Sequence, residues 1–186
     1  MRAILFALSL FTATAVQAQG FTCPGFALGR DTRASVIAFM KEAGIEFNEN
    51  SEGLRCKQKS SLILTTDAMF CDGLPGQPIA AGVMIDHASG KAVAATFVYP
   101  YDYSLHEQLH RRLKQQFAPI GASKLPAALR DLQAHEELTA AFYGSNMTVW
   151  LLAPSLSATH GAPASTVVYA LPKYVGMART DPRQCE

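Results

Sequence analysis

The residues whose types and spacing could do chemistry form one short string, His106-Glu107-Gln108-Leu109-His110. On a helix, two histidines four residues apart lie on one face, where both imidazoles could ligate a zinc ion. A glutamate directly after the first histidine could act as general base on a zinc-bound water. The spacing therefore admits a zinc-dependent hydrolase with His106 and His110 as ligands and Glu107 as the base.

This string resembles the zincin metallopeptidase motif, and the resemblance covers five residues of the chain. It implies zinc as the cofactor and a peptidase-like activity. The sequence departs from that family after the motif, where Arg111 and Arg112 stand in place of an uncharged and then an apolar residue. No pattern fixes a third ligand, for which the candidates are His135, Glu136 and Glu137.

A structural interpretation explains the same string without a metal. Ser104 and Glu107 stand three residues apart before an apolar run, which is the pattern of a helix-capping box worth about 1 kcal/mol. Leu105, Leu109 and Leu113 recur every four residues and predict a helix with one face in the core. The capped helix is the leading interpretation, so no catalytic or metal-binding residue is predicted, and the zinc hydrolase is the alternative.

The first residues predict a secretory signal peptide over 1–18. Arg2 supplies the positive charge, residues 3–15 are uncharged and mostly apolar, and Val16-Gln17-Ala18 offers a cleavage site. The apolar stretch is shorter than the roughly 20 residues of a spanning helix. We therefore expect an exported protein, periplasmic or secreted, whose mature part is residues 19–186, with no membrane span once the signal is removed.

All four cysteines lie in the expected mature part, at positions 23, 56, 71 and 185. Export would place them in an oxidising compartment, where paired cysteines persist as disulfides. Four cysteines allow three pairings. We favour Cys56–Cys71, which closes a short loop, and Cys23–Cys185, which ties the two ends of the mature chain together.

Composition predicts a folded domain and argues against a nucleic-acid partner. Apolar residues make up 49% of the chain and charged residues 17%, which suits a globular protein with a real core. The net charge is only +1, and the chain contains no long basic run. A nucleic-acid ligand is therefore not expected.

Hydrophobic periodicity and turn residues predict an α+β domain. Helices are expected over 31–44, 104–117 and 126–134, and strands over 62–66, 79–86, 91–99, 138–143, 147–153 and 166–171. Because hairpin connections dominate, we expect two layers: an antiparallel or mixed sheet with two or three helices on one face. Residues 19–186 form a single domain in this scheme, and the similar order of residues 31–99 and 104–172 suggests tandem halves.

These observations favour a non-enzymatic binding module over an enzyme. The chain holds no complete catalytic set, so we expect no cofactor, with zinc belonging only to the alternative. The partner would be an unknown protein or small ligand. Tyr99, Tyr101 and Tyr103 alternate before the 104–117 helix and either line a binding groove or pack across a sheet edge.

Overall fold

The computed structural model of the protein describes residues 27–50, 61–66, 73–156 and 163–178. The expected signal peptide and all four cysteines lie outside these residues, so the export and disulfide predictions stay predictions.

The described strands form one eight-stranded sheet, in the order β1-β2-β3-β4-β8-β7-β6-β5. All neighbouring strands in this sheet are antiparallel. The strands are β1 (Asn48–Asn50), β2 (Ser61–Thr66), β3 (Ala80–Asp86), β4 (Ala92–Pro100), β5 (Ala118–Pro119), β6 (Leu138–Tyr143), β7 (Thr148–Leu156) and β8 (Pro163–Ala170).

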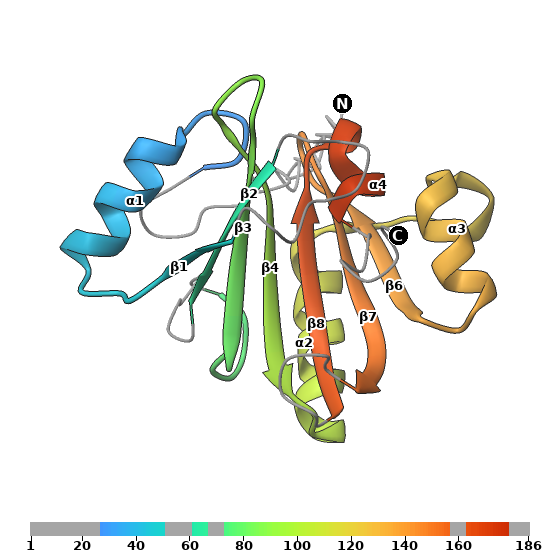
Figure 1. The fold of residues 1–186 in the computed structure, drawn as a ribbon. Coiled ribbons are helices and arrows are strands. Elements are labelled where there is room, and N and C mark those ends of the chain that lie inside the picture. The colour runs from blue at the N-terminus through green and yellow to red at the C-terminus, as the bar shows by residue number, and fades with distance from the viewer. Residues whose placement is uncertain (1–26, 51–60, 67–72, 157–162, 179–186) are drawn as a thin grey trace, which may run out of the picture.

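Four α-helices accompany the sheet in the described part of the chain. They are α1 (Arg33–Glu42), α2 (Tyr103–Gln116), α3 (Ala127–Ala134) and α4 (Val175–Ala178). Short 3₁₀ turns, η2 (Ala122–Lys124) and η3 (Pro172–Tyr174), precede the last two helices. Figure 1 shows α2 behind the centre of the sheet, α4 in front of it, and α1 and α3 at its two sides.

One face of the sheet packs against α1 and α2. Val36 and Met40 of α1 and Leu109 and Leu113 of α2 are fully buried there. Alternate residues of the strands meet them, including Phe97 of β4. The predicted leucine stripe of the 104–117 helix is therefore confirmed at Leu109 and Leu113, while Leu105 lies half-buried at its edge.

The other face of the sheet carries a second core, built around α3 and the short segment η3–α4. Leu129 and Leu132 of α3 pack there with Trp150 and Val168 of the central strands. The α+β class and the antiparallel sheet are confirmed, but the helices divide between both faces instead of gathering on one. The physical reason is that β7 and β8 are apolar on successive residues and must be covered on both sides.

The sheet is made of two consecutive meanders of four strands each. Each meander follows a helix, α1 before β1–β4 and α2 before β5–β8, and the two last strands, β4 and β8, pair in the middle. The tandem duplication over 31–99 and 104–172 stays a prediction. The described part of the second half also contains α3, which is inserted between β5 and β6.

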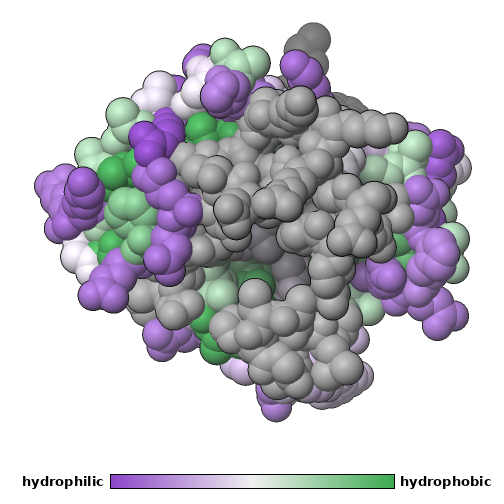
Figure 2. Space-filling model, in the orientation of Figure 1, coloured by the Kyte–Doolittle hydropathy of each residue, from purple (hydrophilic) through white to green (hydrophobic). Residues whose placement is uncertain are grey.

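The surface polarity follows this arrangement. Figure 2 shows hydrophilic side chains on the outer sides of the molecule, where Figure 1 places α1 and α3. Among the described residues, none of the helices combines the length and apolar character required to cross a membrane.

Candidate functional site

The helix that carries the His106–His110 string begins where the chain leaves the sheet. β4 ends at Pro100, and the Tyr101 amide still donates to the Pro163 carbonyl at 3.1 Å. Asp102 then adopts an extended conformation and caps α2, because its Oδ1 accepts the Leu105 amide at 2.8 Å. The expected cap at Ser104 is therefore wrong: Ser104 lies inside the first turn, and its hydroxyl accepts from Gln108 Nε2 at 3.1 Å.

His106 is buried between α2 and two strands, with 6% of its surface exposed. Its Nδ1 shares a hydrogen bond of 2.9 Å with the hydroxyl of Ser165 on β8, which is fully buried. Its Nε2 shares a bond of 3.1 Å with the hydroxyl of Thr139 on β6. Hydroxyls can donate or accept, so both ring nitrogens are satisfied in either neutral tautomer.

Burial also sets the protonation of this imidazole. Desolvation lowers the pKa of His106 below its ordinary value of 6.5, and the nearby His110 acts in the same direction. Glu107 opposes the shift through its negative charge. His106 is therefore kept neutral at pH 7 as a fixed, hydrogen-bonded member of the core.

This geometry does not favour the zinc alternative. A histidine ligand offers one ring nitrogen to the metal, whereas both nitrogens of His106 are already occupied by hydroxyls. His110 is half-buried, with its ring centroid 6.2 Å from that of Phe142. Within the described residues no group of three or more His, Cys, Asp or Glu side chains is arranged to hold a metal ion.

The candidate third ligands of the zinc alternative lie at the end of α3, in the layer on the other side of the sheet. His135 closes that helix, and its Nδ1 shares a hydrogen bond of 2.7 Å with the Asp131 carbonyl. Glu136 and Glu137 follow it and are exposed. All three residues therefore lie in the turn that joins α3 to β6.

The three alternating tyrosines do not form one groove. Tyr99 is buried, and burial raises the pKa of its phenol. Tyr101 and Tyr103 are exposed by 42% and 70%. The Tyr101 ring lies edge-on to His106, with 6.4 Å between the ring centroids.

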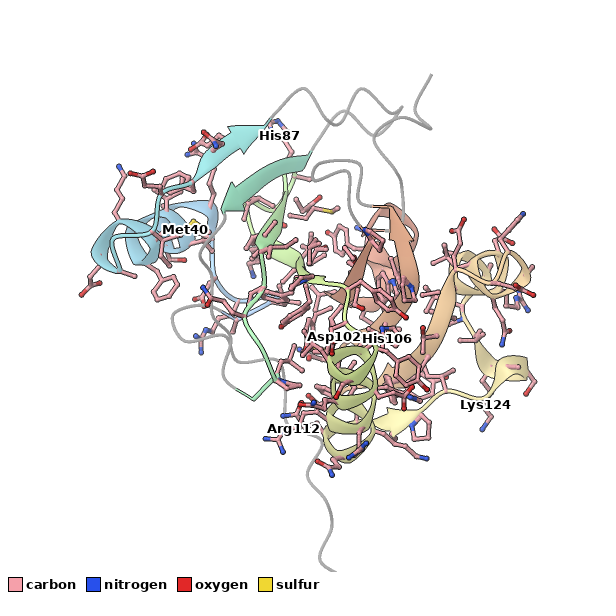
Figure 3. The ribbon with its side chains drawn as sticks, turned by 90° about the horizontal axis from the view of Figure 1, so that it is seen from below. Met40, His87, Asp102, His106, Arg112 and Lys124 are labelled. Atoms are coloured by element: carbon pink, nitrogen blue, oxygen red, sulfur yellow. The ribbon has the colours of Figure 1, made fainter. Side chains whose placement is uncertain are left out.

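The opposite side of α2 forms a groove that sequence patterns did not single out. Gln108, Arg111, Arg112 and Gln115 follow one another at helical spacings of three, one and three residues and so share one face. This face borders a shallow, open groove of about 400 Å³, bounded on its other side by Gly73, Leu74 and Pro75. Figure 3 shows Arg112 on the side of α2 turned away from His106.

Specific contacts hold the 73–76 loop beside the helix. Arg112 Nε donates to the Gly73 carbonyl at 2.7 Å, and both Leu74 and Leu105 pack against the core on the α1–α2 face of the sheet. Gly76 has a φ of +78° and approaches Leu105 so closely that an added Cβ would lie 2.8 Å from the leucine Cδ1. The loop therefore runs along α2 and gives the groove a defined second wall.

A short basic cluster such as Arg111 and Arg112 on a helix usually marks a solvated face, so the sequence alone gives no reason to expect a groove there. The polar stripe of Gln108, Arg111, Arg112 and Gln115 is visible in the sequence, but its second wall lies more than thirty residues earlier in the chain. Only the folded chain brings the stripe and the loop together.

Comparisons with known proteins give no match: no protein-family model, no curated protein and no solved structure resembles this chain significantly.

Proposed function

We propose that the chain is an exported, non-enzymatic binding module and that its ligand occupies the groove between α2 and the 73–76 loop. The groove itself carries this proposal. Its volume of about 400 Å³ falls within the roughly 300–1,000 Å³ of ordinary ligand pockets. It combines an apolar wall of Leu74 and Pro75 with four polar side chains, Gln108, Arg111, Arg112 and Gln115, which can fix the orientation of a ligand.

The hydrogen bonds of His106 support a binding role for the protein over a catalytic one. Its imidazole holds two strands to α2 through hydroxyl groups, which gives the residue a role in the core. The polar side chains of the groove carry guanidinium and carboxamide groups, which bind and orient ligands but are poor nucleophiles and bases at neutral pH.

The test is a ligand screen read by thermal unfolding of the intact, oxidised protein. The single tryptophan, Trp150, is fully buried and reports unfolding through its fluorescence. Small compounds and short peptides of different charge and polarity are screened against the wild-type protein, Arg111→Gln and the control Lys114→Gln. Lys114 lies on the same helix and is exposed, but it does not line the groove.

We expect at least one class of compound to raise the melting temperature of the wild-type and Lys114→Gln proteins but not of Arg111→Gln, since only a bound ligand stabilises the native state. A shift that is equal in all three proteins, or no shift with any compound, would overturn the assignment of the groove.

A further inference from the structure

We infer that the groove takes an extended peptide segment carrying an acidic side chain, an inference that rests on the proposed binding function. Its four helix residues supply two kinds of recognition. Arg111 and Arg112 provide positive charge, and Gln108 and Gln115 provide paired donors and acceptors.

The length of the groove suits a short extended segment. Gln108 and Gln115 are seven residues apart on α2, which at 1.5 Å per residue separates them by about 10 Å along the helix axis. An extended chain rises about 3.3 Å per residue, so this distance spans about three residues of a peptide. The two carboxamides would thus meet backbone groups at either end of that segment.

Carboxamides are suited to an extended backbone because each offers an N–H donor and a C=O acceptor, as a peptide group does. Gln108 donates one N–H to Ser104, which leaves its second N–H and its oxygen for a ligand. Leu74 and Pro75 on the facing loop give apolar contact to the side chains of the segment.

The charge of the groove selects an acidic partner. The described residues that line it include two arginines and no acidic side chain. The ion pairs found among the described residues, Arg30–Asp31 and Arg33–Glu49, involve neither of these arginines. Arg112 donates its Nε–H to the Gly73 carbonyl and so holds the loop. Arg111 is exposed and has no hydrogen bond or ion pair with the other described residues, so its guanidinium can bind a carboxylate with paired hydrogen bonds.

The weak overall charge favours a local carboxylate over a polyanion. The chain carries a net charge of +1, and the basic residues of the groove are confined to one stretch of α2. Long-range attraction to a highly charged polymer needs a wider basic surface. A single acidic side chain between apolar and amide contacts fits this distribution better.

The experiment measures fluorescence anisotropy with pools of labelled peptides about six residues long, a size that overfills the groove. Both ends are blocked, and one pool has a single central Asp or Glu while the matched pool has Asn or Gln there. Inorganic phosphate and acetate are added alone as competitors. The proteins are the wild type, Arg111→Gln, Gln115→Ala and Lys114→Gln.

We expect the acidic pool to bind about tenfold more tightly than its amide match, since a charge-assisted hydrogen bond is worth about one such factor or more. Arg111→Gln should remove this preference. Gln115→Ala should weaken both pools, and Lys114→Gln should change neither. Phosphate and acetate should compete only weakly, because they lack the backbone that the carboxamides contact.

Each other outcome has a distinct meaning. Equal binding of both pools, weakened by Gln115→Ala, would refute the acidic preference and leave the groove as a peptide site. Strong binding of phosphate without peptide binding would refute the peptide and leave an anion site. Peptide binding that no groove variant alters would refute both this inference and the proposed function.

Discussion

Replacing His106 by alanine should destabilise the protein far more than replacing His110, although the two form a matched pair in the sequence. His106→Ala removes hydrogen bonds to Ser165 and Thr139, each worth about 0.5–1.5 kcal/mol. It also leaves the Ser165 hydroxyl, which is fully buried, without this partner, at a cost of about 1–3 kcal/mol. The free energy of unfolding should therefore fall by about 3 kcal/mol.

His110→Ala should cost only about 1 kcal/mol. Its side chain is half-buried, and its described contact is the tilted packing of its ring against Phe142. A further variant, His106→Asn, should recover part of the loss, because a carboxamide can keep one of the two hydrogen bonds.

The assay is urea unfolding at pH 7.5 under oxidising conditions, followed through the fluorescence of Trp150, which is buried in the second core. The structural role would be refuted if His106→Ala cost less than about 1 kcal/mol or no more than His110→Ala. If His106→Ala and His110→Ala lost equal stability only when zinc was present, and a chelator removed this loss, the zinc-hydrolase alternative would be supported instead.

Three further predictions use the same unfolding assay. Asp102→Ala should cost about 1 kcal/mol because it removes the cap of α2, whereas Ser104→Ala should stay within about 0.5 kcal/mol; the reverse order would contradict the cap at Asp102. Burial lowers the pKa of His106, so its contribution to the free energy of unfolding is complete above about pH 6.5 and is lost as the pH falls through the lowered pKa. The wild type should therefore lose more stability than His106→Asn between pH 7 and pH 5. Parallel losses in the two proteins would contradict this. Gly76→Ala and Gly90→Ala should each lower the free energy of unfolding by about 1–2 kcal/mol because both positions have positive φ. Only Gly76→Ala should also weaken ligand binding, since its added Cβ would press on Leu105. Unchanged ligand binding in both variants would count against the loop as a wall of the groove.

Local signals in the sequence were sufficient for most of the elements. The first helix forms as expected, with Val36 and Met40 inward and Gly44 at positive φ just after its end. The hairpin over 87–90 also forms, where Asp86 accepts both the amide and the hydroxyl of Ser89. These features depend on residues within one or two turns of each other, so periodicity and turn chemistry could predict them.

The start of α2 shows how tertiary structure decides between two local signals. Both Asp102 and Ser104 are suitable cap residues, and Glu107 made Ser104 the better match to a capping box. The sheet, however, holds the chain as far as the Tyr101 amide, and Asp102 is the next residue that can turn into the helix. The strand end therefore fixes the cap.

The sequence also contained a signal for the second core, in the successive apolar residues of two strands, but the prediction of helices on one face relied on the hairpin connections. Sheets of antiparallel hairpins commonly have one solvent-exposed face, which favoured a prediction with all helices packed on the other face. The runs 149–152 and 167–170 are apolar at successive residues, which indicates strands buried on both faces. Trp150 and Val168 point to the second core, and α3 and η3–α4 cover them.

The partners of His106 could not be predicted, because they lie 33 and 59 residues further along the chain. A histidine string on a helix has the same pattern whether its neighbours are two more ligands or two hydroxyls. What distinguishes these cases is the register of β6 and β8 under α2, which depends on the whole sheet.

The two sides of α2 carry the core and the proposed ligand groove, and experiments can separate the two roles. The inner side holds His106, Leu109 and Leu113 in the core, so changes there act on the free energy of unfolding. The outer side presents exposed Arg111 and Gln115 to the groove, where substitutions on an exposed helix surface change stability by about 0.5 kcal/mol or less. A variant of the outer side that loses ligand while keeping its unfolding curve therefore reports on binding alone, which is what the proposed function requires of this helix.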